Sequence, residues 1–188
     1  MRNLWIPLLC GCMFILGGCG QAGPVAAPAS PVGMEATAAA GEGESGARVA
    51  WVPDAPAAAI GELLSLQLRV SGIQALYGFE LQLSYDPAML EVVDVDAGTE
   101  GSQIAHGMFL SPDFVVENRA DAAAGTIHYA VTQSAPAEAQ SGEGTLVVVE
   151  LRARAAGTTT LVIRELLLSD VDGAALEVDW EDLALTIQ

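Results

Sequence analysis

Apolar side chains occupy every second position in several stretches of this 188-residue chain. From Tyr77 to Tyr85 all odd-numbered residues are apolar, whereas all even-numbered residues are glycine or polar. Residues 66–70 repeat this pattern, and residues 127–131 do so except at Ala130. A period of two places alternate side chains on opposite faces of a β-strand, whereas a helix would mix apolar and polar residues on one face. We therefore predict strands that bury one face and expose the other.

Turn-forming residues divide the chain after residue 46 into nine short segments of β-type residues, without a convincing long amphipathic helix. This organisation predicts an all-β fold, a sandwich of nine strands. The run from Leu146 to Val149 is apolar at every position, so we expect it in the middle of a sheet covered on both faces. The predicted strands are residues 48–52, 63–70, 76–85, 90–95, 114–117, 126–132, 145–153, 160–167 and 183–187.

The first nineteen residues have the layout of an export signal. A basic start at Arg2 precedes an apolar run over residues 4–16, which is too short to span a membrane comfortably. That run ends in Leu16-Gly17-Gly18-Cys19, which resembles the lipobox at which a diacylglycerol is attached to the cysteine thiol. We interpret residues 1–18 as a lipoprotein signal peptide and Cys19 as the lipidation site; the alternative is a plain signal peptide.

Residues 20–46 consist mainly of Ala, Gly and Pro with a few Glu, and they show no apolar periodicity. This composition predicts a disordered linker between the lipidated Cys19 and the domain. A diacylglycerol together with an amide-linked acyl chain is enough for stable membrane attachment. We therefore expect an exported protein, anchored to the membrane by lipid and facing the cell exterior or the periplasm.

All three cysteines lie in the first nineteen residues, so residues 47–188 cannot form a disulfide framework. A segment of this length can bury a hydrophobic core without a metal or a disulfide, and we interpret it as one domain. The chain has 24 acidic residues and seven basic residues, all arginine. Loss of Arg2 with the signal changes the net charge from -17 to about -18. Such a charge repels nucleic acid and anionic lipid surfaces.

No residue pattern indicates catalysis or metal binding. His106 and His128 are the two histidines, and neither is accompanied by the spacing of a zinc site. The segment 169–173 resembles the start of a calcium loop but lacks its later ligands, so a hairpin turn is the preferred interpretation. The many carboxylates are interpreted as solvated charge rather than as a glycosidase pair. We therefore expect neither a cofactor nor an enzymatic activity.

The segment from Tyr85 to Val95 resembles the signature Y-D-P-x-x-L-E-V-x-x-V of cohesin domains. Asp86 and Pro87 would turn the chain after one strand, and Leu90 would enter the core. Other features of the family follow in order: Gly61 before the second strand, a turn at residues 142–144 before a strand, and a final strand at residues 182–187. The resemblance extends over nearly all of residues 47–188.

This resemblance implies a nine-stranded jelly-roll β-sandwich that acts as a non-catalytic interaction module. Cohesins bind dockerins, which are small calcium-loaded helical modules carried by polysaccharide-degrading enzymes. The family binds mainly through its third, fifth, sixth and eighth strands. In this chain these correspond to residues 76–85, 114–117, 126–132 and 160–167.

The resemblance also assigns candidate partner-binding residues on the outward side of these strands. Glu80 occupies a position at which cohesins often carry an acid that accepts hydrogen bonds from the dockerin. Gly78 departs from the family, which often has an amide side chain there, so the class of dockerin stays open. The full set is Gly78, Glu80, Gln82, His128, Ala130, Thr132 and the following Gln133.

The alternative function is carbohydrate binding, which on a β-sandwich usually requires aromatic rings aligned on an exposed face. The alternation assigns Tyr77, Phe79, Tyr85 and Tyr129 to the core, whereas Trp51, Phe109, Phe114 and Trp180 remain unassigned. If two or three of the unassigned rings were exposed and coplanar, binding of a polysaccharide would become the preferred function.

Overall fold

The computed structural model describes residues 46–111 and 114–188, which form twelve strands arranged as two six-stranded sheets. These residues contain no helix, and hence none that could span a membrane. The expected signal peptide, the lipidated Cys19 and all but the last residue of the linker lie outside the described residues.

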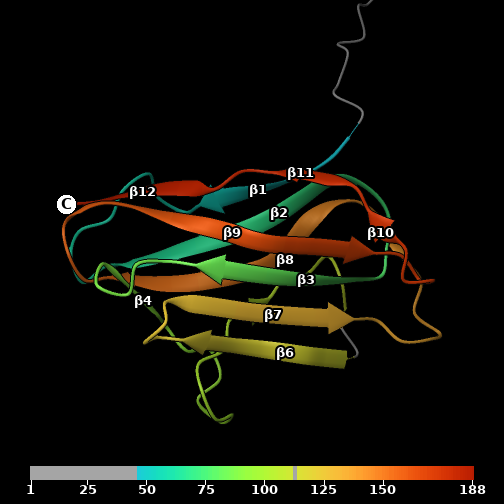
Figure 1. Cartoon of the computed structure of the whole chain (residues 1–188), viewed down its shortest axis with the longest axis horizontal. Helices are drawn as coiled ribbons and strands as arrows, with labels where there is room; N and C mark the ends of the chain where they lie inside the picture. Colours follow the sequence, from blue (N-terminus) through green and yellow to red (C-terminus); the bar gives the residue numbers. More distant parts are fainter. Residues whose placement is uncertain (1–45, 112–113) are drawn as a thin grey trace, which may run out of the picture. The chain divides into compact units, whose positions relative to one another are not determined.

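The first sheet, here called the back sheet, has the strand order β11-β1-β2-β8-β4, and β5 also pairs with β8. Its strand pairs are antiparallel, except that β1 and β11 are parallel. In Figure 1 the back sheet lies behind the other sheet. Its strands are β1 (Ala47–Pro53), β2 (Leu63–Leu76), β4 (Leu90–Val92), β5 (Ala105–His106), β8 (Gln140–Ala153) and β11 (Val178–Trp180).

The second sheet, here called the front sheet, has the strand order β10-β9-β3-β7-β6, and β12 also pairs with β9. All of its strand pairs are antiparallel. Its strands are β3 (Gly78–Ser84), β6 (Phe114–Asp121), β7 (Thr126–Thr132), β9 (Gly157–Ser169), β10 (Ala175–Leu176) and β12 (Leu183–Ile187).

The core lies between the two sheets and follows the alternation of the sequence. In β3, Phe79, Leu81 and Leu83 are buried, and Glu80 and Gln82 between them are only partly buried. Thirty buried apolar residues, most of them from the two sheets, form one cluster. The all-β sandwich predicted from the sequence is therefore confirmed.

All nine predicted strands are present, and three very short strands were missed. The missed strands are β5, β10 and β11, each of two or three residues. A segment this short contains too few residues to show a period of two. β8 is an interior strand of the back sheet, between β2 on one side and β4 and β5 on the other, as its apolar run predicted.

Two predicted turns have different outcomes. The prediction of a turn at residues 142–144 is wrong, because these residues belong to β8 and pair with β2 across an irregular register. The segment Ser169–Gly173 does turn the chain between β9 and β10. There the carboxylate of Asp170 accepts hydrogen bonds from the backbone N–H groups of Asp172 and Ala174. The prediction of a hairpin turn is therefore confirmed.

Candidate partner-binding face

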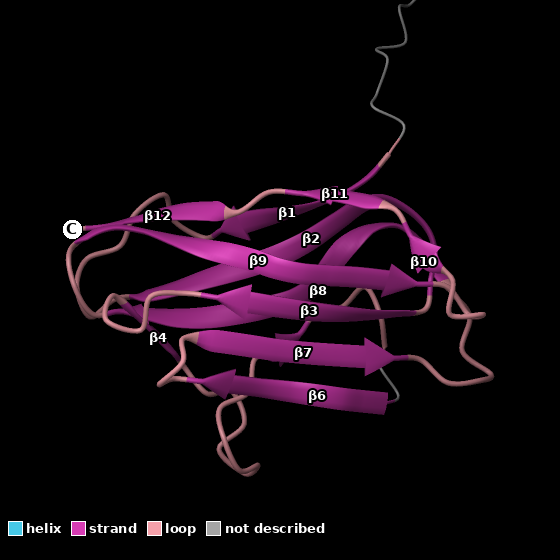
Figure 2. Cartoon of the chain, viewed as in Figure 1, coloured by secondary structure: helices cyan, strands magenta, loops and turns pink. Residues whose placement is uncertain are grey.

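The four strands implied by the cohesin resemblance lie side by side in the front sheet. The structure places them in the order β9-β3-β7-β6, although they come from distant parts of the chain. In Figure 2 no described segment lies in front of these strands. Their outward side chains form a surface that is here called the front face.

The candidate residues of β3 and β7 are direct neighbours across the two strands. Gly78 pairs with Thr132, Glu80 with Ala130, and Gln82 with His128. Six of the seven candidate partner-binding residues therefore form three adjacent rows on one face.

Gln133 is the exception, and its assignment to this surface is wrong. Its side chain is only 4% exposed, and its amide nitrogen donates a hydrogen bond to the carbonyl oxygen of Glu138. The strand ends at Thr132, so the next residue does not continue the outward row.

One half of the front face is polar and acidic. The side-chain amide of Gln82 donates to a carboxylate oxygen of Glu80 at 3.2 Å and to one of Glu165 at 2.7 Å. Neither carboxylate forms a salt bridge within the described residues. A single neutral amide therefore holds two negative charges close together, and both remain accessible from solvent.

The other half of the front face is apolar and hollowed. Gly78 lies in a shallow depression with a volume of about 380 Å³, which the polar residues Glu80 and Thr132 also line. A Cβ atom at Gly78 would lie 2.9 Å from the carbonyl oxygen of Val131, so any other residue at this position would require the neighbouring strand to shift. The apolar residues Val116 and Leu167 also line the depression, and they are 62% and 50% exposed.

Sequence reasoning missed Glu165, Leu167 and Val116 because register irregularities change which residues face outward. The pairing of β3 with β9 shifts between Gln82 and Leu83, and Glu165 and Leu167 then lie opposite Gln82 and Glu80. The pairing of β6 with β7 has a second irregularity, which leaves Val116 without a partner residue on β7. A strict period of two cannot locate such bulges. The run of three apolar residues, Phe114-Val115-Val116, was the one available signal.

The two histidines occupy separate environments. His128 lies on the front face, opposite Gln82 on β3 and Arg119 on β6. His106 lies on β5, and its Nδ1 is hydrogen-bonded to the hydroxyl of the buried Tyr129. Burial raises the pKa of Tyr129 well above the ordinary value of a tyrosine. In the part of the chain that the structure describes, no group of side chains has the composition of a metal site.

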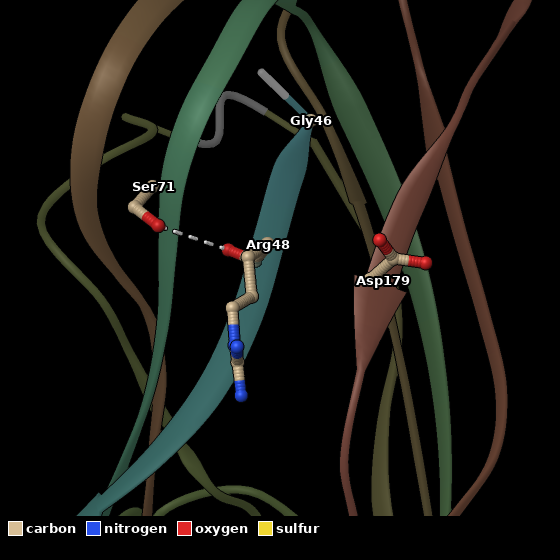
Figure 3. Close-up of a pocket in the computed structure, with 4 residues that line it drawn as sticks. All are labelled: Gly46, Arg48, Ser71 and Asp179. Carbon is tan, nitrogen blue, oxygen red and sulfur yellow. Dashed lines mark hydrogen bonds between the residues drawn. The ribbon is translucent and has the colours of Figure 1, made fainter. Parts of the chain in front are cut away.

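A further hollow, of about 240 Å³, lies where the described chain begins (Figure 3). Ser71 donates a hydrogen bond to the backbone carbonyl of Arg48, and Asp179 lies on the neighbouring strand β11. The guanidinium of Arg48 pairs at 2.8 Å with Glu181, and both side chains are substantially exposed. These are surface contacts, and they do not converge on a common point.

The unassigned aromatic residues do not form a platform for a sugar. Trp51 and Phe109 pack against the core. Phe114 and Trp180 are 60% and 41% exposed, but they lie on β6 of the front sheet and β11 of the back sheet. Of the rings assigned to the core, Phe79, Tyr85 and Tyr129 are buried, whereas Tyr77 is only partly buried.

The cohesin-domain family model matches residues 49–180, which include every element of the front face. The chain belongs to the cohesin family. The resemblance found in the Tyr85 to Val95 segment is thereby confirmed. Cohesins are non-catalytic interaction modules, which agrees with the partner-binding interpretation of the front face. No curated protein sequence matches the chain significantly.

Solved cohesin structures share the fold at low sequence identity. A type II cohesin domain from the cellulosome of Acetivibrio cellulolyticus is 21% identical, with a TM-score of 0.63 over 74% of this chain and 95% of that chain. A chain from a type II cohesin–X-dockerin complex of the same organism is 17% identical, with a TM-score of 0.62 over 76% and 99%. A non-cellulosomal cohesin from the archaeon Archaeoglobus fulgidus is 17% identical, with a TM-score of 0.59 over 76% and 91%.

Proposed function

We propose that this cohesin domain binds a dockerin module through the front face and is held at the cell surface by a lipid on Cys19. The observation that carries the dockerin proposal is the assembly of β9, β3, β7 and β6 into one uncovered sheet. Family membership supports the partner class, because a similar structure is that of a cohesin–dockerin complex. Enzymes that degrade polysaccharides are the proposed carriers of the dockerin.

The front face has the composition of a protein-binding surface. Its apolar half contains small residues, Gly78 and Ala130, beside the exposed apolar residues Val116 and Leu167. Acidic and amide side chains adjoin these apolar residues. Specific protein interfaces usually combine apolar contacts with polar ones in this way.

Calorimetry with the full chain tests the dockerin proposal. A dockerin from a secreted enzyme of the same organism should bind in the presence of calcium. Chelator should abolish binding, because calcium organises the dockerin loops, and should leave the melting temperature of this chain unchanged. Insoluble polysaccharide is the control ligand. Retention on polysaccharide without measurable dockerin heat would overturn the proposal in favour of carbohydrate binding.

The lipid anchor is tested by the substitution Cys19→Ser. The thiol of Cys19 is the proposed site of acylation, so the serine variant should leave the membrane fraction or persist as an uncleaved precursor. Fractionation and labelling with a radioactive fatty acid distinguish these results. The matched control is Cys12→Ser, which should behave like the wild type. A Cys19→Ser variant that is cleaved, labelled and membrane-bound like the wild type would contradict the lipoprotein proposal.

A further inference from the structure

We propose that a second hollow, between β6 of the front sheet and the segment leading into β5 of the back sheet, binds a primary ammonium group on a short alkyl chain. This side hollow has a volume of about 420 Å³ and is lined by Val95, Asp96, residues 103–106 and Asn118. Asn118 pairs with the buried Tyr129, so its side chain is directed inward rather than onto the front face. The inference therefore goes beyond the proposed function, and no residue of the front face takes part in it.

Gln103 provides the observation that points to a ligand. Its side chain lines the side hollow and is only 6% exposed. Its amide nitrogen donates a hydrogen bond to the carbonyl oxygen of Glu100 at 3.0 Å, whereas its Oε1 atom is buried and has no donor among the described residues. A buried acceptor without a donor costs free energy, so a ligand that supplies the missing N–H group would gain from this contact.

Asp96 and His106 bring two more acceptors to the side hollow. Hydrogen bonds from Thr99 and Gly98 lower the pKa of the Asp96 carboxyl group below its ordinary value, so this group is negatively charged at neutral pH. Each carboxylate oxygen accepts one of these bonds and can accept another. His106 uses Nδ1 for the hydroxyl of Tyr129, and Nε2 is an acceptor in the tautomer in which Nδ1 donates.

The scarcity of free donors in the side hollow determines the charge of the ligand. The side-chain nitrogens of Asn118 and Gln103 already donate to backbone carbonyl groups. The chain has no lysine, and Arg119 pairs with a residue of the front face. An anion would therefore meet a negative charge and no basic group. An ammonium group has three N–H donors and a positive charge, which match the acceptors of Asp96, Gln103 and His106.

Apolar residues of the side hollow account for the alkyl chain of the ligand. Val95 is 44% exposed, and Ile104 and Ala105 line the hollow with it. Alkyl stems of cationic groups pack along apolar surface of this kind while the charged end stays at polar groups. A metal ion would leave this surface unused, and no group of three metal-binding side chains occurs in the described part of the chain. The ligand class is thus a primary alkylamine, either a free amine or the side chain of a lysine.

Nuclear magnetic resonance of the full chain tests this inference. The probes are putrescine and N-acetyl-lysine methylamide, and binding should shift the side-chain amide signals of Gln103 and the ring signals of His106. A response to the lysine probe alone would identify a lysine side chain as the source of the ammonium group, and a response to putrescine alone would identify a free diamine. The trimethylated lysine probe keeps the charge but lacks N–H donors, so it should bind at least about tenfold more weakly.

Two variants and a matched control provide the second measurement. Asp96→Asn keeps an acceptor for the Gly98 N–H but removes the charge, and Gln103→Met removes the buried acceptor. Each should weaken binding of the responding probe by at least about tenfold. Asp172→Asn, at an exposed acid in the turn after β9, should leave the affinity unchanged. The dispersion of the backbone signals reports whether each variant is folded.

Three results would overturn the inference. They are unchanged Gln103 and His106 signals with both amines, equal affinity of the primary and trimethylated probes, and equal affinity of folded Asp96→Asn and the wild type. A response to zinc chloride without any response to an amine would also overturn it, in favour of a metal site. No dockerin is present in these measurements, so their outcome is independent of the dockerin calorimetry.

Discussion

Leu90 shows how one residue of the family signature stabilises the fold. Asp86 accepts a hydrogen bond from the backbone N–H of Ala88, and this turn delivers Leu90 to the core with 0% exposure. Leu90→Ala should therefore lower the free energy of unfolding by about 2 to 5 kcal/mol. Denaturant unfolding of the full chain measures this change. A mutant that melts within a degree or two of the wild type would contradict the position assigned to Leu90.

Tyr129 should make the stability of the domain sensitive to alkaline pH. Burial raises the pKa of Tyr129 in the folded state, so its contribution is complete below the ordinary tyrosine value of 10.0 and is lost as the pH rises above it. The chain has no lysine to obscure this titration. Tyr129→Phe should reduce the decline in stability above pH 10 by up to about 1.4 kcal/mol per pH unit. Equal alkaline slopes for mutant and wild type would contradict this prediction.

At the scale of the elements, Asn118 of β6 holds the segment before β5 in place. Its side-chain oxygen accepts from the backbone N–H of Ile104 at 3.0 Å, and its nitrogen donates to the carbonyl of Ile104 at 2.8 Å. Asn118→Ala should cost about 1 to 3 kcal/mol, because it leaves both backbone groups of the buried Ile104 without this partner. Hydrogen exchange at the Ile104 amide should accelerate, whereas Arg119→Ala should leave it unchanged. Unaltered exchange in Asn118→Ala would refute the role of this contact.

The strands show which features of the fold follow from the sequence. β7 and β12 match their predicted bounds, because each segment begins directly after a turn-forming residue, Gly125 or Asp182. β2 and β8 extend beyond their predicted bounds through Gly72 and Gly142, both of which have positive φ. Their pairing there is irregular and depends on the neighbouring strand, which local sequence does not specify. The same limitation applies to the Asn118–Ile104 contact, which joins residues fourteen positions apart.

At the scale of the whole molecule, the prediction of the front face depended on the family resemblance more than on the alternation of apolar residues. The alternation identified Glu80, Gln82 and His128 as outward residues. It could not predict that β3 lies beside β9 or that β7 lies beside β6. It also could not find Leu167, which a register irregularity directs outward. The two halves of the front face therefore became visible only when the four strands were placed together.

The most direct test of dockerin binding through the front face is a calorimetric titration. A dockerin from the same organism is titrated into the full chain and into two charge-reversal variants. Glu80→Arg replaces an acceptor on β3 of the front face by a positive charge, so binding should weaken by about 1 to 3 kcal/mol. Glu143→Arg makes the same change at an exposed position of β8 in the back sheet, and its affinity should equal that of the wild type. Equal affinity of Glu80→Arg and the wild type, or equal weakening in both variants, would contradict binding through the front face.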